Sequence, residues 1–83
     1  MDGRHDATLS FSYADERRAR TVAESVGVEE GEIADDRSAV TVERDGRTVR
    51  VRVTAADLVA LRAGVNTWTR LVAVAERVAA RAA

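Results

Sequence analysis

The C-terminal third of the chain has the residue spacing of one long helix, and apolar residues form two separate stripes along it. The first stripe follows alternating steps of three and four residues, which places its members on one side of a helix. Its members are Leu58, Leu61, Val65, Trp68, Val72, Ala75 and Ala79. A second ridge, about a third of a turn away, consists of Ala60, Thr67, Leu71, Val74 and Val78. One stripe is enough to pack a helix on its own domain, so the second ridge predicts contact with a partner.

Polar residues next to the apolar periods predict where two helices begin and end. The first helix covers residues 14–26, and its apolar face consists of Ala19, Val22, Ala23 and Val26. Ser12, three residues before Asp15, predicts an N-cap with an acidic third position, and Gly27 predicts a left-handed residue after the last turn. Thr54, three residues before Asp57, predicts the same kind of cap for the second helix.

Three short segments show the alternation of half-buried strands. Residues 7–13 place Leu9, Phe11 and Tyr13 on one side, with serine and threonine on the other. Residues 38–44 and 47–53 flank Asp45-Gly46, a strong signal for a hairpin with a two-residue turn. Such a turn pairs Val42 with Val49 and Val40 with Val51, so that both pairs share one face. The opposite face receives Thr41, Glu43, Thr48, Arg50 and Arg52.

The element order β-α-β-β-α predicts an α+β fold. The strands form a three-stranded antiparallel sheet in the order 1-3-2, and both helices cover one face of it. Residues 1–6 are expected to be a flexible tail, and residues 7–83 to be one domain. A last helix that reaches Ala82 would be about 40 Å long, whereas the strands reach only about 23 Å. Its C-terminal turns must therefore overhang the sheet or pack on a partner.

Composition argues against most enzyme classes. The 83 residues contain no cysteine, and a net charge of −1 provides no global positive field for a polyanion. All 13 basic residues are arginine, which is typical of GC-rich coding or a salt-adapted organism, or of forked contacts to phosphate and carboxylate. The single histidine, His5, lies in the expected tail, so we predict no catalytic residue, cofactor or metal site.

Two further features of the sequence concern its surroundings. The acidic run from Val28 to Arg37 has the composition of a solvated loop, and its spacing fits no calcium loop. No stretch has the layout of a signal peptide or the roughly 20 apolar residues of a membrane span. We therefore expect a cytoplasmic protein that has no contact with a membrane.

Two arginines of the hairpin are candidates for a contact surface. Arg50 and Arg52 project from the expected central strand, on the face away from the helices, near Ser10 and Thr41. The face is either solvated, with one arginine near Glu43, or a site of contact with phosphate or a second subunit.

A polar pair on the last helix is a second candidate. Arg62 and Asn66 lie four residues apart on a side that neither apolar stripe occupies, which is typical of a solvent-facing surface. Gly64 lies between them, where glycine costs about 1 kcal/mol relative to alanine. A close approach by another backbone and neutral drift explain this glycine equally well.

The helix motif resembles a known family. Ala56-Asp57, followed by Ala60-Leu61-Arg62-Ala63-Gly64-Val65-Asn66-Thr67, is similar to the Ala-Asp…Leu-Arg-Ala-x-x-Asn-Ser signature of the Pcc-type small subunit of the KEOPS (EKC) complex. Length and element order also agree, and the resemblance covers nearly the whole chain. Thr67 stands where serine is common in that family.

The resemblance implies a non-catalytic dimerisation and adaptor subunit. The complex installs threonylcarbamoyladenosine in tRNA, and its catalytic subunit has an ASKHA fold. The expected partners are a second copy of the chain, in a homodimer, and this catalytic subunit, with tRNA contacted indirectly or weakly. The expected contacts with the catalytic subunit are Ala60, Arg62, Asn66, Thr67, Leu71, Val74 and Val78, helped by Ala19, Ala23 and the exposed side of the first helix. The dimer would form through strand edges or through the sheet face that carries Ser10, Thr41, Arg50 and Arg52.

Two alternatives of other classes remain. A stand-alone RNA-binding module would use Arg50, Arg52, Arg62 and Arg70, although the near-neutral net charge argues against it. A small ligand-binding regulatory domain would need a glycine-rich or polar pocket where a strand meets a helix, and no motif for one is present.

Overall fold

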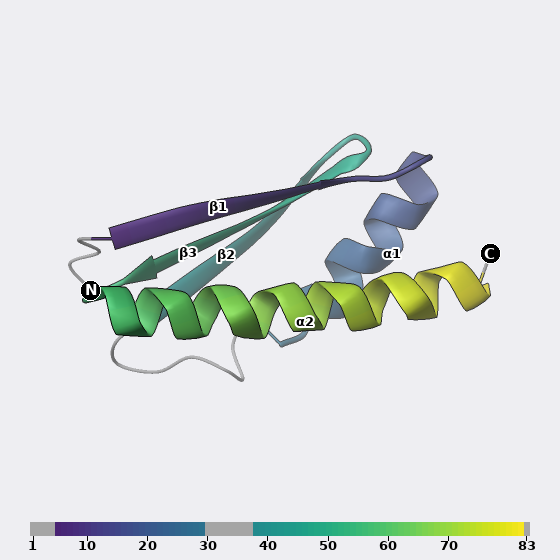
Figure 1. Cartoon of the computed structure of the whole chain (residues 1–83). Helices are drawn as coiled ribbons and strands as arrows, with labels where there is room; N and C mark the ends of the chain where they lie inside the picture. Colours follow the sequence, from purple (N-terminus) through teal and green to yellow (C-terminus); the bar gives the residue numbers. More distant parts are fainter. Residues whose placement is uncertain (1–4, 30–37, 83) are drawn as a thin grey trace.

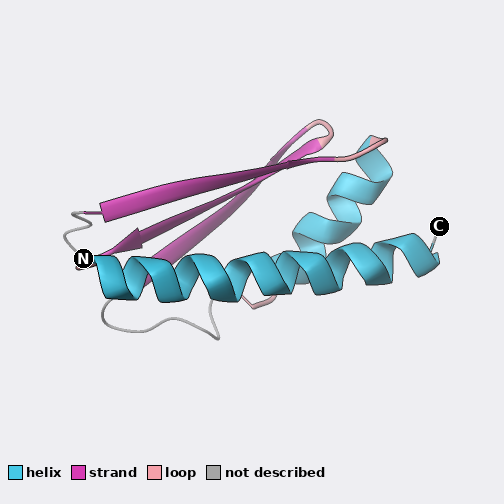
Figure 2. Cartoon of the chain, in the orientation of Figure 1, coloured by secondary structure: helices cyan, strands magenta, loops and turns pink. Residues whose placement is uncertain are grey.

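A computed structural model describes residues 5–29 and 38–82 of the chain. In order, the elements are β1 (His5–Ser12), α1 (Glu16–Gly27), β2 (Ser38–Asp45), β3 (Thr48–Ala55) and α2 (Leu58–Ala82). β3 lies between β1 and β2 and is antiparallel to both. Both helices lie on the same side of the sheet (Figures 1 and 2). The predicted α+β fold, with its 1-3-2 strand order, is therefore confirmed.

β3 forms the centre of the core because strands flank it on both sides and helices cover one of its faces. Its alternate residues Val49, Val51, Val53 and Ala55 are at most 1% exposed. Valine favours such a pleated, covered surface, and strict alternation sends arginine and threonine to the open face. β1 adds Leu9 and Phe11 beside these residues, and β2 adds Val40 and Val42. α1 contributes three buried residues, Ala19, Val22 and Val26.

The hairpin between β2 and β3 has a different register from the predicted one. Val42 lies opposite Val51 and Val40 opposite Val53, whereas the prediction paired them with Val49 and Val51. Asp45 lies opposite Thr48, so the two turn residues are Gly46 and Arg47 rather than Asp45 and Gly46. Gly46 has a φ of +61°, which suits the first position of a turn of the Gly-x kind. The pairing is shifted by two residues, and because side chains alternate with a period of two, each keeps its predicted face.

Both helices begin later than predicted, and each is capped by an aspartate. The Asp15 carboxylate accepts a hydrogen bond from the Arg18 backbone N–H at 2.7 Å. The Asp57 carboxylate accepts one from the Ala60 N–H at 2.8 Å. Of the predicted caps, Ser12 is instead the last residue of β1, and Thr54 lies within β3. In both strands the hydrogen-bond ladder holds the backbone in an extended conformation. An aspartate at the N-cap satisfies an orphan N–H and also complements the positive end of the helix.

The end of α1 and the expected tail also differ from prediction. Gly27 is the last residue of α1 and is not left-handed, since Gly46 is the only described residue recorded with positive φ. His5 and Asp6 belong to β1, so the sheet takes in two residues of the predicted tail. Residues 1–4 of that tail, and residues 30–37 of the predicted acidic loop, lie outside the described residues.

α2 approaches the sheet most closely at Gly64. A Cβ atom added there would lie 2.8 Å from Val53 Cγ1, closer than side chains tolerate. The mid-helix glycine is therefore explained by a close approach, although a buried side chain of β3, not another backbone, makes it. The last turns of α2 extend beyond the sheet and lie beside α1 (Figure 1). There Ala75 and Ala79 are each 4% exposed.

We predict that the effect of Gly64→Ala on the free energy of unfolding is opposite in sign in the natural chain and in a Val53→Ala variant. In the natural chain the added methyl overpacks Val53, and we expect a net loss of about 1 kcal/mol in the free energy of unfolding, after the helix-propensity gain is counted. In a Val53→Ala background the clash is gone, so the same substitution should raise that free energy by about 1 kcal/mol. Urea denaturation of the four chains measures both values. A stabilising Gly64→Ala in the natural chain would contradict the close approach.

Candidate protein-binding surface

The first apolar stripe of α2 forms the helical half of the core. Its four innermost members are almost completely buried: Trp68, Val72, Ala75 and Ala79. Leu61 and Val65 are half-buried, whereas Leu58 is 60% exposed. The predicted stripe is thus core from Trp68 onward, Leu61 packs against that core, and the first residue of the stripe projects into solvent.

The second ridge of α2 is only partly covered by the domain. Ala60, Thr67 and Leu71 are half-buried, and Leu71 packs against the core. Val74 and Val78 are each 50% exposed. Apolar side chains that recur at the surface along one helical ridge are typical of a contact site. The C-terminal part of the ridge is therefore available to a partner.

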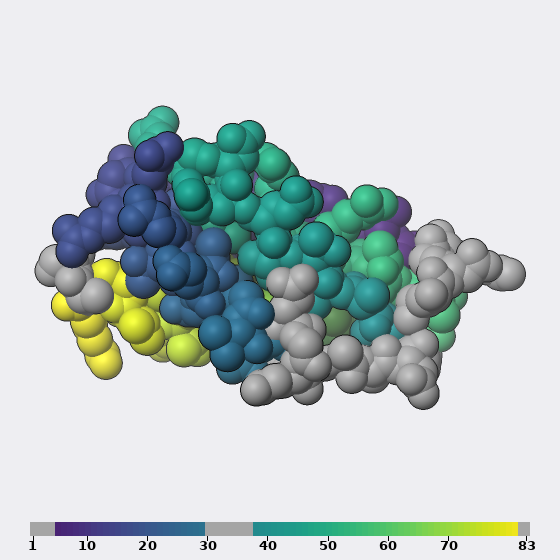
Figure 3. All heavy atoms as spheres, turned by 180° about the vertical axis from the view of Figure 1, so that it is seen from behind, coloured from purple at the N-terminus to yellow at the C-terminus, as the bar shows by residue number. Residues whose placement is uncertain are grey.

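A shallow groove of about 120 Å³ lies between this ridge and α1. It is lined by Ser25, Val26, Glu29, Leu71, Val74, Ala75 and Val78. Figure 3 shows the outer surface of α1, in blue, directly beside the yellow C-terminal end of α2. The groove brings together three of the predicted partner-binding residues, Leu71, Val74 and Val78. Small-molecule sites usually exceed roughly 300 Å³, so the size of the groove favours inserted side chains over a bound metabolite.

The contribution of α1 differs from the predicted one. Ala19 is 0% exposed and Ala23 packs against the core, so neither presents much surface to a partner. The groove wall is instead made by Ser25 and Glu29, which sequence reasoning missed. Ser25 lies in the last turn of α1, and Glu29 lies just after the helix, where its backbone N–H donates to the Val26 carbonyl. Which edge of α1 meets α2 depends on how the two helices pack, and the sequence carries no signal for that.

Arg62 and Asn66 lie away from the groove. Both are exposed and project from the outer side of α2. Among the predicted partner-binding residues, Ala60 and Thr67 lie on the ridge but do not line the groove. The structure therefore divides the predicted set into a C-terminal apolar part and an N-terminal, more polar part.

The open face of the sheet places the two hairpin arginines between the edge strands. Ser10 lies opposite Arg50, and Thr41 lies opposite Arg52. The Arg50 guanidinium is 3.8 Å from the Asp45 carboxylate, and Arg52 is 3.8 Å from Asp6. Each arginine thus has a carboxylate nearby, which offsets the positive charge that a phosphate would need. Such exposed pairs contribute little to stability.

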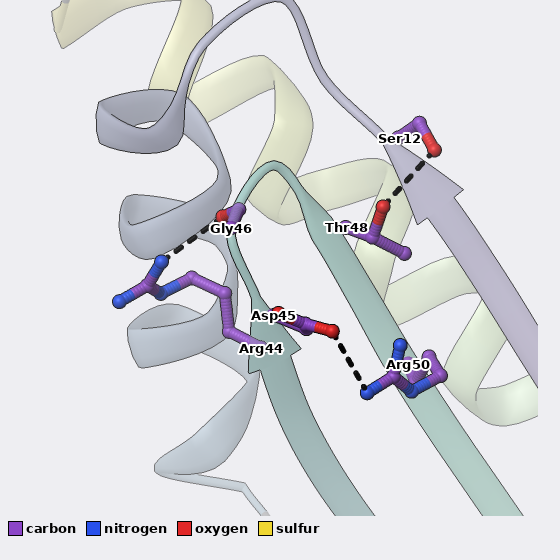
Figure 4. A network of polar contacts seen from close by, with 6 residues as sticks. All are labelled: Ser12, Arg44, Asp45, Gly46, Thr48 and Arg50. Carbon is purple, nitrogen blue, oxygen red and sulfur yellow. Dashed lines mark hydrogen bonds and ion pairs between the residues drawn. The ribbon is translucent and has the colours of Figure 1, made fainter.

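The polar contacts at the hairpin turn join all three strands (Figure 4). The Ser12 and Thr48 hydroxyls lie 3.3 Å apart, from β1 to β3. Arg44 Nη1 donates to the Gly46 carbonyl at 3.0 Å, beside the pair formed by Asp45 and Arg50. The Ser12–Thr48 and Asp45–Arg50 contacts lie at the turn end of the open face, whereas Arg44 has the strand phase of Val42 and lies on the helix side.

One half-buried polar contact ties the residue that follows β1 to α2. The Tyr13 hydroxyl donates to Glu76 Oε2 at 2.8 Å. Burial raises the pKa of Tyr13, and the Glu76 carboxylate raises it further because it accepts that hydrogen bond and carries a negative charge. A phenol that holds its proton more firmly is unsuited to act as a base or nucleophile at neutral pH. The contact is therefore structural.

The described residues contain neither a metal-ligating cluster nor a membrane-spanning helix. Within residues 5–29 and 38–82, no three side chains of the metal-ligating kinds gather closely enough to hold an ion. In the same part of the chain, neither helix combines the length and the apolar character needed to cross a bilayer.

Comparisons with known proteins agree on the fold. A profile of the family described as Pcc1, "Transcription factor Pcc1", matches residues 6–80, which cover the sheet and both helices except for His5 at one end and the last two residues of α2 at the other. A chain of the crystal structure of the binary complex Gon7-Pcc1 is 21% identical, with a TM-score of 0.69 over 98% of this chain and 94% of that chain. At this identity the likeness shows the fold alone. No curated protein matches the chain.

We predict that Tyr13 controls the stability of this protein at alkaline pH. The chain has one tyrosine, no cysteine and no lysine, and arginine stays protonated throughout this range. Because the folded state raises the pKa of Tyr13, stability should be constant below the unfolded pKa of about 10 and decrease above it. The slope should not exceed about 1.4 kcal/mol per pH unit, and it should be smaller because Tyr13 is partly exposed and solvent screens its carboxylate neighbour.

Urea denaturation between pH 9 and 11.5 tests this pH dependence. Tyr13→Phe removes the titrating group, so its stability should be lower at pH 9 through loss of the hydrogen bond but flat with rising pH. An equal alkaline slope in Tyr13→Phe would assign the effect to another group.

Proposed function

Because this chain belongs to the Pcc1 family, we propose that it is a non-catalytic adaptor subunit of a tRNA-modifying complex of the KEOPS type. In this role it binds the ASKHA-fold catalytic subunit and forms a homodimer in the cytoplasm, and it contacts tRNA indirectly or weakly. The complex makes threonylcarbamoyladenosine, and the catalytic site lies on the partner.

The half-exposed valines of α2 are the observation on which this proposal rests. Val74 and Val78 line a groove whose floor is apolar and whose other wall is α1. Burial of their exposed halves under a partner contributes about 1 kcal/mol for each valine. A helix of the partner that inserts side chains into this groove would form a three-helix packing with α1 and α2.

The homodimer forms through a strand edge in this proposal. β1 and β2 are both edge strands of eight residues. Within β1, residues 7–12 carry no charged side chain and no proline, the devices that usually protect an edge from pairing. β2 ends in three charged residues, which discourage edge pairing, so β1 is the better suited edge. The sheet-face alternative is less favoured because Arg50 and Arg52 already lie near carboxylates of their own chain.

We predict that Val74→Asp/Val78→Asp abolishes binding to the ASKHA-fold catalytic subunit of the same organism. Each aspartate would place an unpaired charge in the apolar contact, while in the free protein it faces water, so the fold should persist. Isothermal titration calorimetry measures binding, and circular dichroism with urea denaturation checks the fold. Leu71 is a poorer target because it packs against the core.

The matched control is Leu58→Asp/Val59→Asp, which places two aspartates on the same helix at residues that are 60% and 71% exposed. This variant should bind like the natural chain. Undiminished binding by Val74→Asp/Val78→Asp, or equal loss in both variants, would refute the groove as the adaptor site.

We also predict that Arg50→Ala/Arg52→Ala leaves the dimer intact. An edge-to-edge dimer is held by backbone hydrogen bonds, which these side chains do not make. Size-exclusion chromatography with light scattering gives the mass of both chains. Dissociation of the variant into monomers would place the dimer contact on the sheet face instead.

A further inference from the structure

The surface of α2 carries an excess of positive charge that the domain does not use. The helix contains four arginines, Arg62, Arg70, Arg77 and Arg81, and a single acidic residue, Glu76. Glu76 accepts the hydrogen bond from Tyr13 and so lies on the side of α2 that meets β1. All four arginines are exposed, and none makes a side-chain hydrogen bond or ion pair within the described residues. In a chain of net charge −1, this local excess of positive charge favours contact with acidic groups of another molecule.

Three of these arginines border the groove. Arg70 precedes Val74 by four residues, and Arg77 and Arg81 follow Val74 and Val78 by three each. Residues three and four apart are neighbours on a helix surface, so these side chains form the outer rim of the α2 wall. The opposite wall carries Ser25 of α1 and Glu29, which follows the end of α1. The groove thus has an apolar floor, a positive rim on α2 and a negative group in the turn that follows α1.

From this arrangement, and on the basis of the proposed function, we infer that the occupant of the groove is an amphipathic helix of the catalytic subunit with an acidic edge. Its apolar side chains pack on Val74 and Val78, and its aspartates and glutamates face Arg70, Arg77 and Arg81. Its opposite edge carries a basic residue toward Glu29. Charged residues that flank an apolar seam set the partner and the direction of packed helices in this way.

Two other occupants fit the surface less well. RNA would need stacking partners or base-reading groups, yet Trp68, the only aromatic residue of α2, is 3% exposed, and the groove floor is apolar. A second copy docked groove to groove about a two-fold axis would bring the same arginine rims together, because such an interface uses the same patch on both subunits. Like charges across that contact would oppose it.

The test compares Arg70→Glu/Arg77→Glu/Arg81→Glu with Arg17→Glu/Arg20→Glu/Arg44→Glu. The control makes the same change of net charge at exposed arginines that do not border the groove. Each full chain is titrated into the ASKHA-fold catalytic subunit at several NaCl concentrations between 50 and 500 mM. Binding of an unmodified tRNA transcript and the dimer mass are measured beside it, and circular dichroism checks the fold.

We expect the rim variant to bind the catalytic subunit at least about tenfold more weakly at low salt, since each exposed pair contributes modestly and three are reversed. Its affinity should also lose the salt dependence that the natural chain and the control retain. If the rim variant and the control bind alike while Val74→Asp/Val78→Asp does not bind, the groove stands but the acidic edge is refuted.

Other outcomes refute the inference in different ways. Loss of tRNA binding with unchanged binding to the catalytic subunit would assign the arginines to RNA. Dissociation of the dimer in the rim variant alone would assign them to contact between two copies. Undiminished binding by Val74→Asp/Val78→Asp would remove the groove itself, and with it the proposed function.

Discussion

The close packing of α2 on the central strand is the contact on which the remaining architecture depends. Gly64 lets the helix settle against Val53, and from there Trp68 and Val72 reach the valine row of β3. A helix held this closely has one orientation, because rotating it would drive a Cβ atom into the strand. The same orientation turns the second ridge away from the sheet. The exposure of Val74 and Val78 is thus a consequence of how the first stripe is buried.

The difference in length between the two helices decides how much of that ridge stays open. α1 has 12 residues and α2 has 25, so at ~1.5 Å per residue one is about half as long as the other. α1 covers the end of α2 that extends beyond the sheet, and the two helices leave a groove between them. The domain therefore buries only part of its apolar helix surface by internal packing. The remainder, bordered by arginines, has the composition expected of a site for a partner helix.

Particular residues show why some predictions held and others did not. The alternation of β1, β2 and β3 predicted the buried face correctly even though the hairpin register was wrong by two residues, because an even shift preserves the faces. Both helix caps were placed three residues too early. Ser12 and Thr54 are plausible caps by local pattern. Both instead belong to strands, because pairing with neighbouring strands extends β1 through Ser12 and β3 through Thr54. The aspartates that follow then begin the helices. Local capping preferences are small compared with a ladder of hydrogen bonds.

By itself, the sequence determined the element order, the strand faces and the two stripes of α2, because each follows from the period of apolar residues along one stretch of chain. It also determined that the ridge would be in surplus, since the ridge members lie outside the stripe that fills the core. Only the tertiary structure decided that Ser25 and Glu29 form the second wall of the groove, and that Arg50 and Arg52 of β3 lie near carboxylates whereas the arginines of α2 do not. Those facts depend on which edge of α1 meets α2 and on which residues face each other across strands. Both are set by packing between segments far apart in the chain.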